Sequence, residues 1–263
     1  MGRPRKSLQK KPDLESGSRS ARRTLEIFEL LLKRGEPQTV AKIIATLKIP
    51  KSTTYELVKT LTDAGYISAN SRGGGLFLGP KLYELGMAYG NNVDLLRDGN
   101  AIVEELRDET GETVQLSVLD KNQMMVVLKA EGIRHLRIIS NVGSRVPVNW
   151  AAAGRLLVSD MDDRTLTALL KETTCQSPTG KAFTDVQKLI TQVRSFRRQG
   201  FATELNEANE HAGCIAAPVI NTAGRCIAAL SVVVPEQRMV KPNREELIAS
   251  VTRAAARLSR FVG

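Results

Sequence analysis

Residues 51–67, KSTTYELVKTLTDAGYI, predict one helix whose two faces differ in chemistry. One face is an apolar stripe that needs a core to pack on, formed at helical spacing by Leu57, Val58 and Leu61. The opposite face is rich in hydrogen-bond donors, carried by Thr54, Tyr55, Lys59 and Thr62. A helix of this kind can pack on a protein core with one side and lie against a groove with the other.

Both ends of this helix carry typical boundary residues. Ser52 and Thr53 are expected to act as N-caps, since their hydroxyls can accept hydrogen bonds from the first free helical amides. Gly65 tolerates a positive φ and is expected to end the helix. Residues 66–67 then begin an extended segment.

Two further helical patterns precede this one. Residues 20–33 predict a helix capped by Ser20, with an inward face made of Leu25, Phe28, Leu31 and Leu32. Residues 38–46 predict a shorter helix that faces inward through Val40, Ile43, Ile44 and Leu47. Two short helices, a tight turn and a third helix indicate a helix-turn-helix. Strand-like residues 66–69 and 76–78 around the glycine-rich residues 70–75 add a hairpin, so the motif is predicted to be winged.

The distribution of charge favours DNA as the partner of this region. The chain has a formal net charge of +10, and residues 1–92 carry 16 Lys and Arg against 8 Asp and Glu, leaving 22 against 20 for residues 93–263. A helix with hydroxyl and lysine side chains fits the major groove, where it can meet bases and phosphates. Winged three-helix modules also mediate protein contacts, and that alternative stays open at this point.

The first 19 residues are basic and nearly devoid of large apolar side chains, so we expect a disordered arm. Residues 2–6, GRPRK, are similar to the core of an AT-hook, in which Arg3 and Arg5 would enter the minor groove of A·T-rich DNA. A basic solubilising tail is an equally open interpretation.

The remainder of the chain predicts a second domain of mixed composition. Residues 81–110 are mostly helical in pattern, with expected interruptions at 90–92 and 98–100. Strands are predicted at 114–120, 123–130 and 135–140, and a later hairpin joins 213–220 to 225–234. Helices are expected at about 151–160, 162–171, 185–199 and 243–261. Strands and helices in separate runs indicate an α+β domain on an antiparallel sheet.

Taken together, these segments resemble the IclR family of bacterial transcription regulators. The likeness covers residues 20–263 and includes TGETVQLSVLD at 110–120, VGSRVPVNWAAAGRLLVSD at 142–160 and GCIAAPVINTAGRCIAALSV at 213–232. It implies an α+β chain in which a winged helix-turn-helix is joined by a helical linker to an effector-binding domain similar to GAF and profilin-like folds. The expected segments are a disordered basic arm at 1–19, the DNA-binding domain at 20–79, a linker helix at 80–94 and the effector-binding domain at 95–263.

The resemblance also implies partners. We expect a repressor that binds a palindromic double-stranded operator as a homodimer, with further pairing into a dimer of dimers, and that responds to a small organic acid. The candidate DNA-contacting residues are Arg3, Arg5, Arg22, Arg23, Thr39, Lys51, Ser52, Thr53, Thr54, Tyr55, Lys59 and Arg72.

An effector pocket is implied at the start of the helix near residue 151. A run of small residues at a helix start lets a ligand approach free backbone amides. Carried over from the family, the pocket residues are Trp150, Ala152, Ala153, Gly154, Glu204, Cys214 and Ser231. The chain departs from the family pattern at His211, where glycine is usual, and at Val233, where a hydroxyl often follows the serine. Residues 151–154 are also explained by close packing of a helix on a sheet.

The alternative class is a thiol-dependent hydrolase, with Cys214 as nucleophile, His211 as base and Glu204 completing the set. A cysteine inside an apolar strand is far more often a buried small hydrophobe, so we expect no enzyme and no catalytic residues. Neither a metal-ligand spacing nor a phosphate-binding loop occurs, and His135 is read as a strand residue, so we expect no cofactor and no metal. Three scattered cysteines and the lack of a long apolar run favour a reducing cytoplasm and no membrane partner. The family resemblance implies that this is the bacterial cytoplasm, with the protein on the nucleoid when it is bound to DNA.

Overall fold

A computed structural model of the 263-residue chain describes residues 18–69, 75–91, 94–133 and 140–262. The chain divides into two compact units, Met1–Tyr89 and Gly90–Gly263, and each is described by itself. This boundary falls inside the predicted linker segment, while the four-part division of the chain remains a prediction.

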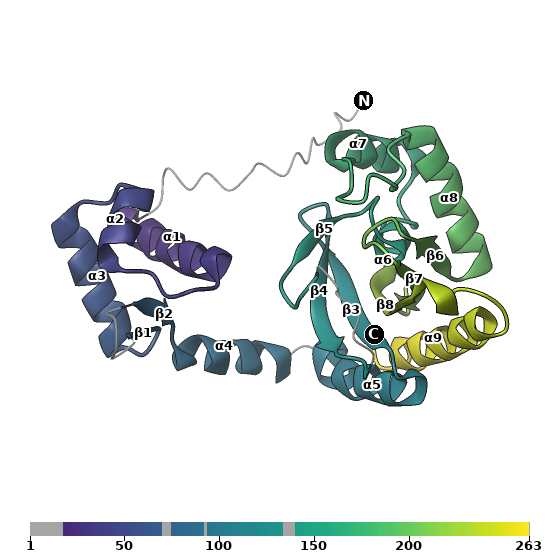
Figure 1. Ribbon diagram of the computed structural model, residues 1–263, viewed down its shortest axis with the longest axis horizontal. Helices are drawn as coiled ribbons and strands as arrows, with labels where there is room; N and C mark the ends of the chain where they lie inside the picture. Colours follow the sequence, from purple (N-terminus) through teal and green to yellow (C-terminus); the bar gives the residue numbers. More distant parts are fainter. Residues whose placement is uncertain (1–17, 70–74, 92–93, 134–139, 263) are drawn as a thin grey trace, which may run out of the picture. The chain divides into compact units, whose positions relative to one another are not determined.

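The first unit contains the three predicted helices, α1 (Arg19–Arg34), α2 (Val40–Leu47) and α3 (Lys51–Asp63) (Figure 1). They enclose a small core whose buried members are Ile27, Leu31, Ile43, Ile49, Val58, Ile67 and Leu76. Each fully buried aliphatic side chain contributes about 1.5–3 kcal/mol relative to exposure, so this core is what holds α3 in place. The apolar stripe predicted on α3 is confirmed, with Leu57 and Leu61 packed beside the buried Val58.

The inward face of α1 differs from the one expected. Ile27 and Leu31 are buried, one helical turn apart, whereas Leu25 and Leu32 are exposed. The predicted cap is also wrong. Ser18, not Ser20, is the N-cap, and its hydroxyl accepts a hydrogen bond from the Ala21 amide in the first turn at 3.4 Å. A chain with serines at both positions offers two possible starts, and sequence spacing alone does not separate them.

The N-cap of α3 also differs from the predicted one. Pro50 holds the N-cap position without a side-chain hydrogen bond, so Ser52 and Thr53 lie inside the first turn instead of capping it. Proline can occupy this position because the amide it lacks has no helical partner there. The helix ends as predicted, with Gly65 at φ 79°.

Strands β1 (Ile67–Ala69) and β2 (Leu76–Leu78) pair antiparallel and confirm the hairpin. Gln38 extends the pairing through a bridge to Leu76, which ties the segment before α2 to the wing. A Cβ atom at Gly79 would lie 2.2 Å from the Gly65 carbonyl oxygen, so only glycine allows the chain to pass the end of α3 there. Helix α4 (Pro80–Asn91) follows.

The second unit is built on a six-stranded antiparallel sheet with the order β5-β4-β3-β8-β7-β6. The strands are β3 (Thr113–Asp120), β4 (Gln123–Ala130), β5 (Arg145–Pro147), β6 (Ala202–Leu205), β7 (Ala212–Ile220) and β8 (Cys226–Pro235). The antiparallel α+β class is therefore confirmed. Strands β5 and β6 have three and four residues and were not predicted, while the strand expected at 135–140 lies almost entirely outside the described residues.

Helices cover both faces of this sheet (Figure 1). One face packs on α5 (Asp94–Thr110) and α9 (Asn243–Ser259). The other packs on α6 (Ala152–Leu157), with α7 (Asp163–Thr173) and α8 (Val186–Gln199) beyond it. Since side chains alternate along a strand, Ile215 faces α9 while its neighbour Cys214 faces α6.

Helix α5 is continuous, so the interruption expected at 98–100 is wrong. A Cβ atom on Gly99 would lie 3.0 Å from Leu116 Cδ2 and 3.1 Å from Leu128 Cδ1. The glycine therefore serves close approach of α5 to β3 and β4, and packing outweighs its low helix propensity.

Candidate DNA interface and ligand cavity

Helix α3 presents a polar exposed face that includes much of the predicted DNA-contacting set. Lys51, Ser52, Tyr55 and Lys59 are exposed, and Thr53 is half-buried. The prediction that Thr54 contacts DNA is wrong, because this residue is 0% exposed. Its hydroxyl donates a hydrogen bond to the Pro50 carbonyl oxygen at 3.1 Å. Thr62 also lies off this face, since its hydroxyl oxygen is buried.

Three exposed residues of α3 are absent from the predicted DNA-contacting set: Glu56, Thr60 and Asp63. Their spacing from Ser52 and Lys59 on the helix was the signal available. Lys59 Nζ donates to Asp63 Oδ2 at 2.6 Å, and this hydrogen bond together with the carboxylate charge raises the pKa of Lys59. Lys59 thus stays protonated, but a phosphate would have to compete with Asp63 for it.

The other predicted DNA contacts are spread over the first unit. Thr39 is exposed and caps α2, accepting a hydrogen bond from the Lys42 amide at 3.3 Å. Arg22 forms an ion pair with Glu26 at 3.9 Å, and Arg23 is half-buried. Arg3, Arg5 and Arg72 lie outside the described residues.

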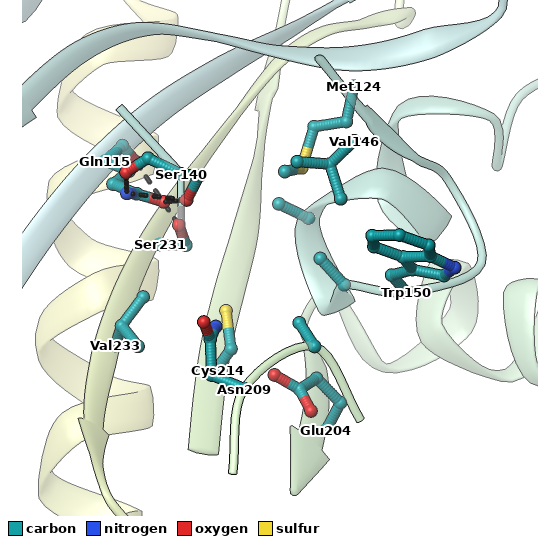
Figure 2. A pocket seen from close by; sticks show the side chains of 13 residues that line it. Gln115, Met124, Ser140, Val146, Trp150, Glu204, Asn209, Cys214, Ser231 and Val233 are labelled. Carbon is teal, nitrogen blue, oxygen red and sulfur yellow. Dashed lines mark hydrogen bonds between the residues drawn. The ribbon is translucent and has the colours of Figure 1, made fainter. Parts of the chain in front are cut away.

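A cavity of about 510 Å³, counting the solvent at its mouth, lies between α6 and the sheet of the second unit (Figure 2). It is lined by Gln115, Met124, Ser140, Val146, Trp150, Ala151, Ala153, Glu204, Ala208, Asn209, Cys214, Ser231 and Val233. Mostly apolar walls with a few polar groups are typical of small-molecule sites. Five of the seven predicted pocket residues come together here: Trp150, Ala153, Glu204, Cys214 and Ser231.

Ala152 and Gly154 do not line the cavity. Ala152 is 0% exposed in the core beneath it. A Cβ atom on Gly154 would lie 2.6 Å from the Val148 carbonyl oxygen, so the glycine allows backbone to pack on backbone. For these two positions the packing interpretation of the small-residue run is the right one.

Eight lining residues were not predicted, and for some of them the sequence contains a pattern that could have indicated the cavity. Val233 follows Ser231 by two residues and so faces the same side of β8, which explains why it enters the cavity. Met124 and Val146 are register partners on β4 and β5, and their meeting depends on an edge strand that has no pattern in the sequence. Ala208 and Asn209 belong to residues 206–211, a segment between β6 and β7 with no periodicity at all.

The polar end of the cavity is formed by a hydrogen-bonded group of Gln115 on β3, Ser231 on β8 and Ser140 in the segment before β5. Gln115 Nε2 donates to Ser140 Oγ at 3.1 Å and to its carbonyl oxygen at 3.3 Å. Ser231 Oγ donates to the Gln115 carbonyl oxygen at 3.4 Å. Figure 2 shows these three side chains grouped on one wall, with Trp150 on the opposite side. The group offers neutral hydrogen-bond donors and acceptors.

Cys214 does not have the environment of a thiolate nucleophile. Burial raises the pKa of its thiol, and hydrogen bonds from Ser231 and from the Ala153 amide offset this only in part. His211, the base of the hydrolase alternative, has a 79% exposed side chain with Nδ1 3.3 Å from Glu236 Oε1. The environments of Cys214 and His211 therefore do not support the nucleophile and base of the hydrolase alternative.

A buried network of three ionisable residues reaches the cavity through Glu204. Arg155 on α6 is 1% exposed and donates through Nη1 to Glu207 Oε1 at 3.2 Å and through Nη2 to Glu207 Oε2. Nη2 also donates to the Asn149 carbonyl oxygen at 2.7 Å. The Glu207 amide in turn donates to Glu204 Oε2 at 2.9 Å. Burial of Glu204 raises the pKa of its carboxyl to about 7.

The described residues provide neither a metal site nor a membrane-spanning helix. No group of three or more His, Cys, Asp or Glu within the described ranges could hold a metal ion. Of the helices in those ranges, none is both long and apolar enough to cross a membrane.

Comparison with known proteins identifies relatives of both units. Residues 20–71 match the IclR helix-turn-helix domain, and residues 87–260 match the C-terminal domain of the bacterial transcriptional regulator IclR. The chain is 30% identical over 244 residues to the HTH-type transcriptional regulator XynR of Escherichia coli K12, covering 93% of this chain and 97% of XynR.

Two further proteins are similar to most of this chain. The HTH-type transcriptional repressor AllR of Salmonella paratyphi A is 27% identical over 233 residues, covering 89% of this chain and 86% of AllR. The crystal structure of an IclR homologue from Microbacterium hydrocarbonoxydans, complexed with 4-hydroxybenzoate, matches with a TM-score of 0.80 at 23% identity, covering 92% of this chain and 99% of that one. This last likeness shows a shared fold.

Proposed function

The chain belongs to the IclR family of bacterial transcriptional regulators, and on that basis we propose that it is a repressor whose affinity for operator DNA changes when a small organic acid binds in its C-terminal cavity. The observation that carries the proposal is the enclosed, mostly apolar cavity with hydroxyl, amide and carboxyl groups at its walls. Repression is supported by the relative AllR, which is named a transcriptional repressor. Such a protein acts in the bacterial cytoplasm, on the nucleoid.

DNA is read by the exposed face of α3, with Ser52, Tyr55 and Lys59 at its centre. Hydroxyl groups can meet base edges or phosphates, while the lysine meets phosphates. Glu56 on the same face would repel phosphate and is suited to accept from a cytosine amino group in the major groove. Arg22, Arg23, Thr39 and Lys51 are proposed as flanking contacts, and the roles of Arg3, Arg5 and Arg72 stay predictions.

The active form is a homodimer, which can pair into a dimer of dimers. Support comes from three exposed apolar side chains of α4, with Tyr83 and Met87 one helical turn apart on one face and Leu85 on another. Such side chains are commonly buried against a second copy. Two-fold symmetry would place two α3 helices on a palindromic operator. Effector binding would shift the population of dimer arrangements and so change the spacing of these helices.

The substitution Lys59→Ala is expected to weaken binding to all DNA sequences and to reduce the salt dependence of log K by about one unit, because one phosphate contact is lost. The measurement is a fluorescence-anisotropy titration at several salt concentrations, with a duplex that the wild-type protein selects from a random library. Lys121→Ala, at an exposed turn of the second unit, is the control. An unchanged salt slope would remove Lys59 from the phosphate contacts.

The substitution Ser231→Ala is expected to weaken the response to effector by about tenfold, because the variant loses one hydrogen bond to the effector. Its affinity for DNA should not change. The matched control is Ser117→Ala, a buried serine on the same sheet face whose hydroxyl has no partner among the described residues. Thermal-shift screening of small acids, beginning with 4-hydroxybenzoate, supplies the ligand. Binding at about 100 times the dissociation constant adds about 2.7 kcal/mol to stability. Equal responses of the two variants would place the effector outside this cavity.

A further inference from the structure

The charge of the cavity wall is unusual for a site that takes an acid. Among its described lining residues none is Lys, Arg or His, and Glu204 is the one with a carboxyl group. The other lining residues are apolar or carry neutral hydroxyl, thiol, amide or indole groups. An anionic ligand that enters this cavity would approach the carboxyl group of Glu204, a residue that is only 5% exposed. Two carboxylates sharing a dry site cannot both stay ionised at low cost.

The neighbouring cation does not relieve this problem. Arg155 directs its two Nη atoms to Glu207 and to the Asn149 carbonyl oxygen, and its buried Nε, which has no hydrogen-bond partner among the described residues, belongs to a side chain that does not line the cavity. The buried network therefore contains two carboxyl groups and one guanidinium. When Arg155 neutralises Glu207, no equivalent charge is left for Glu204.

Every element packed against Glu204 contributes to its protonation state. Cys214, its register partner on β7, carries a thiol that burial keeps neutral. Glu207, in the segment after β6, repels a Glu204 carboxylate through its charge but donates its amide at 2.9 Å. Arg155 on α6 attracts a carboxylate. Burial is the largest influence and raises the pKa of Glu204 to about 7, so the carboxyl carries a proton in a large share of molecules at neutral pH.

From this geometry we propose that the cavity binds a small monocarboxylate together with one proton, and that the protonated Glu204 carboxyl donates its hydrogen to a carboxylate oxygen of the ligand. The proton comes from solvent and stays between the two carboxyl groups, so no bond to carbon forms or breaks. This inference rests on the proposed function of the cavity as the effector site. It restricts the effector to monoanions and excludes dicarboxylates and phosphate esters. It also makes the regulator sensitive to acidity, because a falling pH strengthens effector binding.

The test is isothermal titration calorimetry on the full-length protein with 4-hydroxybenzoate and its uncharged counterpart 4-hydroxybenzamide, from about pH 6 to about pH 8. Each titration is repeated in two buffers of different ionisation enthalpy, which counts the protons taken up. For the carboxylate we expect uptake approaching one proton at about pH 8, and a dissociation constant that rises towards tenfold per pH unit above about pH 7. For the amide we expect almost no uptake.

Glu204→Gln is the central variant, because the glutamine amide can still donate to a carboxylate but cannot titrate. It should bind the carboxylate without proton uptake and with an affinity independent of pH. The matched control Glu210→Gln, exposed in the same segment, should behave as wild type. Arg134→Gln and Arg137→Gln are added because these arginines lie outside the described residues, shortly before Ser140 in the sequence. If one of these arginines instead pairs with the ligand carboxylate, its substitution by Gln would abolish carboxylate binding. Binding to the wild-type protein would then occur without proton uptake.

Wild-type binding of the carboxylate without proton uptake overturns the inference. So does a failure of acetate, pyruvate, benzoate and 4-hydroxybenzoate alike to bind at about pH 6, where Glu204 carries its proton. In that second case the proposed function survives if a dianionic acid shifts the melting temperature of wild type more than that of Ser231→Ala. Conversely, carboxylate binding with proton uptake that leaves DNA affinity unchanged would support the inference and contradict the proposed function.

Discussion

Replacing Arg155 by Met is expected to lower the free energy of unfolding of the second unit by about 3–5 kcal/mol, the largest effect of any single substitution that we predict. The methionine removes the guanidinium that pairs with Glu207 and leaves a buried carboxylate without a cation. It also leaves the Asn149 carbonyl oxygen without that donor. The measurement is urea unfolding followed by tryptophan fluorescence, since Trp150 is the only tryptophan of the chain and lines the adjacent cavity.

Arg253→Met is the matched control for this substitution. Arg253 Nη2 lies 2.6 Å from Glu109 Oε1, but both side chains are about half exposed. Exposed ion pairs contribute about 0–1 kcal/mol, so the control should unfold almost as wild type does. Adding Glu207→Met to Arg155→Met should recover part of the loss, because no unpaired charge then remains. If both arginine variants lose the same small amount of stability, the buried pair is not what stabilises this region.

The second prediction concerns Glu204→Gln, which should be more stable than wild type above about pH 7 by about 3 kcal/mol. The pKa of Glu204 rises from 4.5 to about 7 in the folded protein, so the folded state binds more protons between these values. Stability of wild type therefore falls as the pH rises through this window, and the full loss is present above it. Glutamine keeps the acceptor for the Glu207 amide and has no proton to lose.

Urea unfolding at intervals from about pH 5 to about pH 8 measures this difference. The wild-type and Glu204→Gln curves should converge near the acid end of the range and separate as the pH rises. Glu210→Gln, with an exposed side chain directly after the lining residue Asn209 in sequence, should run parallel to wild type. Parallel curves for Glu204→Gln as well would mean that Glu204 is charged at neutral pH, and the proton-coupled binding mode would then lose its basis.

Local patterns in the sequence were sufficient for most of the secondary structure. The stripe of Leu57, Val58 and Leu61 predicts α3, and the alternation in residues 213–234 predicts β7 and β8. These elements are recognisable because each repeats a burial pattern over two or more periods. Strands β5 and β6 are too short to repeat one, and they form only because β4 and β7 offer free edges.

Two of the predicted helix faces differ from those observed. Thr54 was placed on the donor-rich face of α3 because of its hydroxyl, although it lies one helical turn before Val58, and the hydroxyl is small enough to be buried there on the Pro50 carbonyl oxygen. In α1, Leu25 and Leu32 were predicted to face the core, whereas Ile27, which was not predicted, is buried beside Leu31. In a short amphipathic helix, the spacing of apolar residues determines the direction of the apolar face only to within about one residue. Packing against the neighbouring helices determines which residues are buried.

The sequence by itself determined the order of the elements, the winged helix-turn-helix, the antiparallel α+β second unit and five of the seven cavity residues proposed from the family resemblance. Only the tertiary structure decided how the buried charges are shared. Arg155 and Glu207 are 52 positions apart, and their pairing leaves Glu204 as a lone carboxyl in the cavity wall. Spacing along the chain reports which residues share one face of an element. The protonation state of a buried group depends instead on distances between elements and on exclusion of water, which exist only once the chain has packed.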